Sequence, residues 1–198
     1  HEQNISMGRA NNLMKLFATK VALSFPKDIP PLRRNTIITG NPVRKSVRQI
    51  VAREAALDTL GLDHKKFTIL VMGGSQGSHT INEIVPRALK GMEQSLLEKI
   101  QVIHISGIGD HENVKGFYNG VPVKKVIYSF FDEMEVIYSA ADIAVSRAGS
   151  SVLFELSAHK IPAILIPYPF AAGHQVENAN FMSERGASII LEECLLSA

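Results

Sequence analysis

The sequence lacks several features that would assign the protein to a specialised class. Its 198 residues include no tryptophan and one cysteine, Cys194, so an internal disulfide is excluded, and no group of Cys and His residues has zinc-site spacing. No apolar run approaches the roughly 18 residues of a membrane-spanning helix, because three prolines interrupt the most apolar stretch, 161–172. The net charge of +2 does not favour a nucleic-acid partner. These absences predict a cytosolic, soluble domain without a structural metal.

The features that are present are typical of a globular protein. Apolar residues make up 45% of the chain and charged residues 20%, so a disordered chain is excluded, and the length suits one large domain or two small ones. The chain begins at His1 rather than at Met, without a signal-peptide pattern, and stops at Ala198 shortly after an apolar segment. We therefore expect a piece of a longer protein.

Short β-branched runs alternate with longer helical stretches along the chain. The predicted strands are mostly apolar and cover 21–25, 36–39, 68–72, 102–106, 125–128, 143–146, 163–166 and 188–191. The predicted helices between them cover 8–20, 44–60, 78–99, 132–140, 150–159 and 174–186. This alternation predicts a doubly wound α/β fold, whose ligands bind beyond the carboxyl ends of parallel strands. The proline-rich segment 26–34 is expected to be a surface loop.

The first loop of interest, 73–77 (GGSQG), follows a predicted strand and precedes a predicted helix. Its glycines let the backbone turn tightly, and the amides of the following helix favour a phosphate group. The glycine spacing fits neither a P-loop nor a dinucleotide fingerprint. It does fit the nucleophile elbow of α/β-hydrolases, with Ser75 as the nucleophile. This loop alone is compatible with three interpretations: a phosphate site, the nucleophile of a hydrolase, or a tight turn without a ligand.

A serine hydrolase needs an acid and a histidine after the nucleophile in chain order. Asp142, with His159 or His174, could supply them. No oxyanion segment of the His-Gly-Gly type precedes Ser75, however, so the hydrolase is the weaker interpretation.

A second loop, 146–151 (SRAGSS), repeats the strand–loop–helix arrangement. Ser150 or Ser151 could simply cap the following helix, or the amides of that helix could face an anionic ligand. Glu155 lies one turn further on, where it could be a solvated acid or could accept hydrogen bonds from a ribose diol. Two such loops in one sheet, with an acid beside one of them, suggest a bound nucleotide diphosphate.

A third loop, 167–175 (PYPFAAGHQ), is stiffened by proline and leads into a helix at the same sheet edge. Gln175 can both donate and accept hydrogen bonds, which suits sugar hydroxyls, whereas His174 could equally be a cap or an exposed residue. The remaining histidines have no matching partners and are expected to be structural or exposed: His64, His79, His104 and His111.

Five ordered motifs resemble the MurG family of UDP-N-acetylglucosamine transferases of peptidoglycan synthesis. They are 1–4 (HEQN), 40–44 (GNPVR), 73–77 (GGSQG), 147–150 (RAGS) with Glu155, and the segment 167–178. The resemblance covers nearly the whole chain and implies a GT-B glycosyltransferase, in which two Rossmann-like domains face a cleft. It implies that 35–198 is the C-terminal donor-binding domain, truncated at its end, and that 1–34 is the tail of the N-terminal domain with its connection.

The resemblance also implies how the nucleoside of UDP-N-acetylglucosamine would bind. The uracil would lie against the backbone of Phe131, where the family usually has an aliphatic residue, and Met134 would line the same pocket. Glu155 would bind the ribose hydroxyls, and Arg44 would contact the phosphate or the nucleobase.

The groups implied for the diphosphate and the sugar come from several loops. They are Ser75 and the amides around Ser150, Ser151 and Val152 for the diphosphate, Gln175 with His174 for the N-acetylglucosamine hydroxyls, and Asn4 from the opposite side of the cleft.

By resemblance, the full enzyme transfers N-acetylglucosamine to lipid I and forms lipid II, with inversion at the anomeric carbon and without a metal or cofactor. The resemblance places the catalytic base and the acceptor site in an N-terminal domain that this chain lacks, so the chain is expected to bind donor without turnover. The full-length protein would associate peripherally with the cytoplasmic face of the bacterial inner membrane.

The sequence leaves other functions open beside this one. The chain could be the donor half of a split UDP-N-acetylglucosamine transferase, although its HEQN start argues against that. A UDP-sugar epimerase is a further possibility, but its catalytic acids have no clear counterpart. Leu13, Leu16, Phe17 and Val21 recur at helical spacing, which predicts a stripe that faces a core rather than a membrane.

Overall fold

The computed structural model describes residues 1–26, 35–171 and 173–196. Its centre is one parallel sheet with the strand order β5-β4-β3-β6-β7-β8. The strands are β3 (Phe67–Met72), β4 (Ile100–Ile105), β5 (Lys124–Tyr128), β6 (Ile143–Ser146), β7 (Ala163–Leu165) and β8 (Ser188–Ile190). The chain winds outward from β3 to β5 and then outward from β6 to β8 on the other side. The point where the direction reverses therefore lies between β3 and β6, which is where ligands bind in such sheets.

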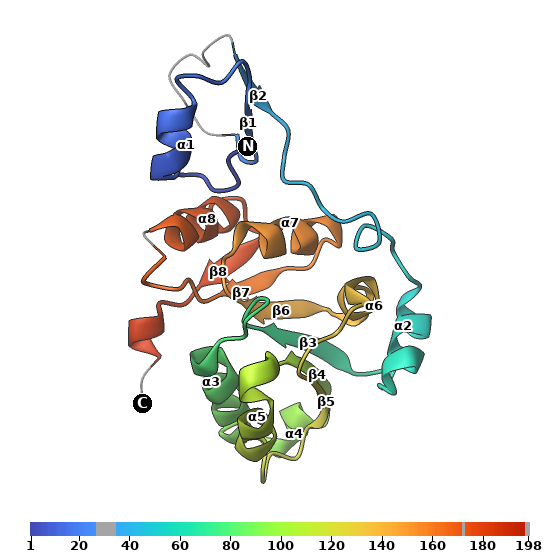
Figure 1. Cartoon of the computed structure of the whole chain (residues 1–198). Coiled ribbons are helices and arrows are strands. Elements are labelled where there is room, and N and C mark those ends of the chain that lie inside the picture. Colours follow the sequence, from blue (N-terminus) through green and yellow to red (C-terminus); the bar gives the residue numbers. More distant parts are fainter. Residues whose placement is uncertain (27–34, 172, 197–198) are drawn as a thin grey trace.

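Helices cover both faces of this sheet (Figure 1). The alternation of side chains along each strand divides the core into two clusters. In β3, Leu70 and Met72 belong to one cluster and Val71 to the other, because successive side chains point to opposite faces. One face packs against α2 (Arg53–Leu60), α6 (Met134–Ala140), α7 (Ser150–Ala158) and α8 (His174–Ser183). The other packs against α3 (His79–Lys90), α4 (Gln94–Leu97) and α5 (His111–Phe117). Burial on both faces explains why the strands are mostly apolar.

Several predicted helices are shorter in the structure. The predicted helix 44–60 is helical only from Arg53, because tertiary contacts hold the earlier part in turns: Val47 is fully buried and the Val51 amide donates to the Ser139 hydroxyl. The predicted helix 78–99 is divided into α3 and α4 after Gly91, which caps α3. The short α5 was not predicted, since it carries a glycine and has weak helical periodicity.

The two remaining strands form a second, separate sheet. β1 (Val21–Leu23) pairs in parallel with β2 (Thr36–Ile38), close to the bridge between Glu2 and Leu23. All the predicted strands are thus present, but these two lie outside the six-stranded sheet. The division of the chain at 34/35 stays a prediction, and apart from Pro26 the predicted loop 26–34 falls outside the described residues.

The predicted core-facing stripe on the first helix is wrong. The helix α1 (Arg9–Met14) is shorter than expected, and Leu13, Leu16 and Phe17 are 62%, 61% and 80% exposed, while Val21 is half-buried. In the part of the chain that the structure describes, no buried residue lies on α1. Among these described residues, no helix has the length and apolar content to cross a bilayer.

Candidate functional site

A cavity of ≈ 490 Å³ opens at the carboxyl edge of the large sheet, beside the point where the strand order reverses. Its size lies within the range of small-molecule sites, about 300–1,000 Å³. Nine of the predicted site residues line it: Arg44, Ser75, Phe131, Met134, Ser150, Ser151, Val152, Glu155 and Gln175. Within residues 1–26, 35–171 and 173–196, no group of three or more His, Cys, Asp or Glu residues could hold a metal ion.

The first wall of the cavity is the loop between β3 and α3, and its conformation requires glycine. A Cβ on Gly73 would lie 2.2 Å from the Ser78 amide nitrogen. Gly77 has a φ of +78°, and its Cβ would lie 2.3 Å from the Ser106 carbonyl oxygen. Ser78 then caps α3 by accepting a hydrogen bond from the Ile81 amide. The loop therefore brings backbone amides and the positive end of the α3 dipole to the edge of the cavity.

The second wall is the start of α7. Gly149 is the N-cap residue and makes no side-chain cap, so the alternative in which Ser150 or Ser151 caps this helix is wrong. Both serines instead lie inside the first turn of α7 and line the cavity together with Val152. Because no side-chain cap occupies the first amides of α7, they can bind an anion that enters the cavity.

Glu155 lies one turn further along α7 and places a carboxylate in the cavity wall. The hydroxyl of Tyr138, from α6, donates to Glu155 Oε2 at 2.7 Å. Burial, together with the charge of Glu155, raises the pKa of Tyr138 far above its ordinary value, so the phenol keeps its proton and remains a donor. The result is an acceptor held in a fixed orientation beside two helix N-termini.

The third wall joins two loops through Gln175, at the start of α8. Its Oε1 accepts hydrogen bonds from the Ala148 amide at 3.2 Å and from the Tyr168 amide at 2.9 Å. This carbonyl oxygen holds the loops after β6 and β7 together, so the side-chain nitrogen is the group that remains for a ligand. Apart from residue 172, the predicted third loop is described by the structure.

Two predicted site residues, Asn4 and His174, are not among the described residues that line the cavity. Asn4 Oδ1 accepts from Asn178 Nδ2 at 3.1 Å, and Asn178 in turn donates to the Ala148 carbonyl at 3.2 Å. Asn4 is therefore connected to the loop after β6 through one intervening side chain, that of Asn178. His174 Nδ1 is buried and has no hydrogen-bond partner among the described residues.

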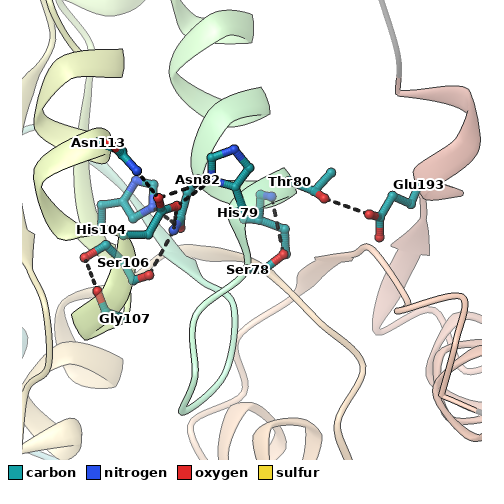
Figure 2. Close-up of polar contacts among 11 residues, drawn as sticks. Ser78, His79, Thr80, Asn82, His104, Ser106, Gly107, Asn113 and Glu193 are labelled. Atoms are coloured by element: carbon teal, nitrogen blue, oxygen red, sulfur yellow. Dashed lines mark hydrogen bonds and ion pairs between the residues drawn. The ribbon is translucent and has the colours of Figure 1, made fainter.

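A buried polar network supports the first loop from behind (Figure 2). His104, on β4, is fully buried, and its Nε2 lies 2.9 Å from Asn82 Oδ1 on α3. Asn82 Nδ2 donates to the Ser106 carbonyl at 2.9 Å and to Asp110 at 2.7 Å. The network thus ties α3 to the loop after β4, where Gly107 lines the cavity. His104 is structural, as predicted, whereas Asn82 carried no recognisable signal in the sequence.

A second cluster of polar contacts, which the sequence did not predict, holds the loop after β6 in place. Arg147 is buried and makes an ion pair with Glu193, and its Nη1 also donates to the Ile166 carbonyl at 3.1 Å. Thr80, on α3, donates to the other oxygen of Glu193 at 2.7 Å (Figure 2). Burial raises the pKa of Glu193, but these two hydrogen bonds and the Arg147 charge outweigh it and lower the pKa below its ordinary value. The Glu193 carboxylate thereby joins the loop after β6 to the first turn of α3.

The residues that a serine hydrolase would need are not assembled. Asp142 precedes β6 and accepts hydrogen bonds from Arg53 and from the Thr68 amide, both at 2.7 Å. It therefore lies at the amino edge of the sheet, whereas Ser75 follows β3 at the carboxyl edge. His159 is hydrogen-bonded to the Val47 carbonyl. The hydrolase interpretation is not supported by this geometry.

The chain matches a described protein family over most of its length. The sequence profile of the glycosyltransferase family 28 C-terminal domain matches residues 68–197. Two similar curated relatives carry the name UDP-N-acetylglucosamine–N-acetylmuramyl-(pentapeptide) pyrophosphoryl-undecaprenol N-acetylglucosamine transferase. The one from Halothermothrix orenii is 38% identical, with 98% of this chain and 54% of that protein aligned. The one from Nitrosococcus oceani is 38% identical, with 100% of this chain and 54% of that protein aligned. This chain spans about half the length of these relatives.

Solved structures give a matching result. The chain is similar to MurG of Acinetobacter baumannii, with a TM-score of 0.77 and 26% identity over 100% of this chain and 53% of that chain. It also shares its fold with WaaG, a glycosyltransferase involved in lipopolysaccharide biosynthesis, with a TM-score of 0.61 and 15% identity over 82% of this chain and 45% of that chain. These neighbours confirm the predicted fold class, one Rossmann-like half of a GT-B glycosyltransferase.

Proposed function

The chain belongs to glycosyltransferase family 28, and from this premise we propose that it is the donor-binding part of a transferase that moves N-acetylglucosamine from UDP-N-acetylglucosamine to lipid I, forming lipid II. One observation carries the proposal: two glycine-containing helix starts and one fixed carboxylate surround a single cavity at the reversal point of the sheet. This combination suits a nucleotide diphosphate, because amides bind the phosphates and a carboxylate accepts hydrogen bonds from a diol.

The proposal assigns one part of the donor to each wall of the cavity. The uracil would lie near Phe131 and Met134, and the ribose hydroxyls would donate to Glu155. The diphosphate would lie between Ser75 and the start of α7, and the sugar would extend toward Gln175. Arg44 lines the same cavity and would add a positive charge near the nucleotide.

The chemistry follows from where the phosphates would lie. In an inverting transfer, the acceptor hydroxyl displaces UDP in line, a base removes the hydroxyl proton, and negative charge develops on the departing diphosphate. Helix N-termini and hydroxyl groups at the first two loops would stabilise that charge. The catalytic base and the acceptor site would come from the other half of the enzyme.

The proposal extends to the whole protein. Residues 1–34 would be the tail of the N-terminal domain, and 35–198 the donor domain. Since lipid I is a membrane lipid, the full-length enzyme would work as a peripheral protein on the cytoplasmic face of the cell membrane. The exposed apolar residues of α1 belong to that first segment. We expect the isolated chain to make no lipid II; lipid II synthesis by the purified chain would contradict this part of the proposal.

Calorimetric titration with UDP-N-acetylglucosamine, UDP and GDP tests the donor site. The chain is expected to bind both uridine compounds and not GDP. The Glu155→Gln variant is expected to bind UDP about 10–100-fold more weakly, because hydrogen bonds to a charged acceptor contribute about 1.5–3 kcal/mol.

Glu112→Gln is the matched control for this titration. Glu112 is exposed on α5, pairs with Lys115 and is not part of the cavity wall, so this variant should bind UDP like the parent chain. Equal affinity for UDP and GDP, or an unchanged UDP affinity of Glu155→Gln, would contradict the proposed site.

A further inference from the structure

Tyr138 lies where it can control the orientation of the cavity carboxylate. Its side chain is 1% exposed, yet the residue forms part of the cavity wall. The hydroxyl donates to Glu155 Oε2 at 2.7 Å and lies 3.9 Å from the Met72 sulfur. The phenol is thus fixed between a buried apolar group and the carboxylate.

The ring of Tyr138 is itself held from behind. It packs against the His159 ring with a centroid separation of 5.3 Å, and His159 is hydrogen-bonded to the Val47 carbonyl. Val47 is fully buried and belongs to the same core cluster as Tyr138. The position of the Tyr138 hydroxyl is therefore set by core packing rather than by solvent.

From this geometry we propose that Tyr138 is a positioning residue, which holds the Glu155 carboxylate for a vicinal diol and so makes the cavity selective for ribonucleotides over 2′-deoxyribonucleotides. The inference rests on the proposed function, since it concerns the ribose of the donor nucleotide. A glutamate side chain has several rotatable bonds, and fixing them before the ligand arrives lowers the entropic penalty of binding.

The selectivity follows from what each nucleotide offers to the carboxylate. Tyr138 occupies one lone pair of Oε2, which leaves Oε1 and the second lone pair of Oε2 for two neighbouring hydroxyls. A 2′-deoxyribose supplies only one of these two hydroxyls. The benefit of the fixed orientation is therefore largest for a ligand that donates to both oxygens.

The test compares UDP with 2′-deoxy-UDP in calorimetric titrations of the parent chain and of Tyr138→Phe. The parent chain should bind UDP more tightly than 2′-deoxy-UDP. Tyr138→Phe keeps the ring but removes the donor, so it should weaken UDP binding by about 10-fold and change 2′-deoxy-UDP binding by much less. A general loss of packing would weaken the binding of both nucleotides alike, so it would not change the ratio of the two affinities.

Tyr118→Phe is the matched control. Tyr118 is also a buried tyrosine, but its hydroxyl contacts His104 and not the cavity, so this variant should keep the parent ratio. A double-mutant cycle distinguishes a role through Glu155 from a general folding defect. If Tyr138 acts through Glu155, Tyr138→Phe should cause no further loss of UDP affinity in a Glu155→Ala background, whereas a folding defect would add its own loss.

The outcomes separate the inference from the function on which it rests. If Tyr138→Phe weakens both nucleotides equally, leaves both unchanged, or adds its full loss on top of Glu155→Ala, the positioning role is overturned while the donor site stands. If the parent chain binds UDP and GDP alike or binds neither, the proposed function is overturned and the inference with it. A selective loss for UDP supports both.

Discussion

Gly77→Ala is expected to abolish measurable UDP binding and to destabilise the fold by about 2–5 kcal/mol. The φ of Gly77 is +78°, and an added Cβ would lie 2.3 Å from the Ser106 carbonyl oxygen and 3.1 Å from Gly107 Cα. Both neighbours are backbone atoms, so no flexible side chain can move aside. The loop between β3 and α3 would have to shift away from the loop after β4, and the amides proposed to bind the diphosphate would move with it.

Gly116→Ala is the control for this prediction. Gly116 lies inside α5, where an added Cβ meets nothing within 4 Å, so alanine should be neutral or stabilising by up to about 1 kcal/mol. Urea unfolding gives the stability of each variant, and calorimetry gives its UDP affinity. A Gly77→Ala chain with the stability and affinity of the parent would show that the contact between the two loops is not required.

Acidification is expected to destabilise the protein through His104. Burial lowers the pKa of His104 to about 4, although the nearby Asp110 charge acts in the opposite direction. The neutral ring is fully bonded: because Asn82 uses its nitrogen as a donor elsewhere, its Oδ1 accepts from His104 Nε2, and Nδ1 accepts from the Tyr118 hydroxyl. A second proton would replace that last acceptor with a donor inside the core.

Acid lowers the free energy of unfolding because the unfolded chain binds a proton at His104 more readily than the folded chain does. Between about pH 6.5 and pH 4 the unfolded chain protonates this histidine and the folded chain does not, so the stability present at neutral pH is lost as the pH falls. The expected loss from His104 between pH 7 and pH 5 is about 2 kcal/mol. Urea unfolding at both pH values should show a smaller difference for His104→Gln than for the parent chain. An identical difference in the two proteins would contradict this assignment.

Strand positions and the loops at the carboxyl edge could be predicted from the sequence because they depend on local pattern. The strands of the large sheet are mostly apolar on both faces, and glycine-rich loops follow two of them, β3 and β6. Doubly wound topology then places those loops side by side at one edge. Nine of the eleven predicted site residues line one cavity. The loops themselves indicated Ser75, Ser150, Ser151, Glu155 and Gln175, whereas the resemblance supplied the other four residues and the identity of the ligand.

The supporting contacts could not be predicted, because they join residues that are distant in sequence. Asn82 meets His104 across 22 positions, Tyr138 meets Glu155 across 17, and Thr80 meets Glu193 across 113. Hydrophobic periodicity describes which face of an element is buried, but it does not specify which polar side chains meet. The first predicted helix gives another example. Its apolar residues recur at helical spacing in the sequence, yet most of them are exposed in the described chain.

A crystal structure of this chain with UDP would test the donor site most directly. The uracil is expected near Phe131 and Met134, both ribose hydroxyls within hydrogen-bonding distance of the Glu155 carboxylate, and the diphosphate between the β3–α3 loop and the start of α7. Tyr138 should keep its hydrogen bond to Glu155 in that complex. UDP bound outside this cavity, or bound inside it with its ribose away from Glu155, would contradict the proposed donor site.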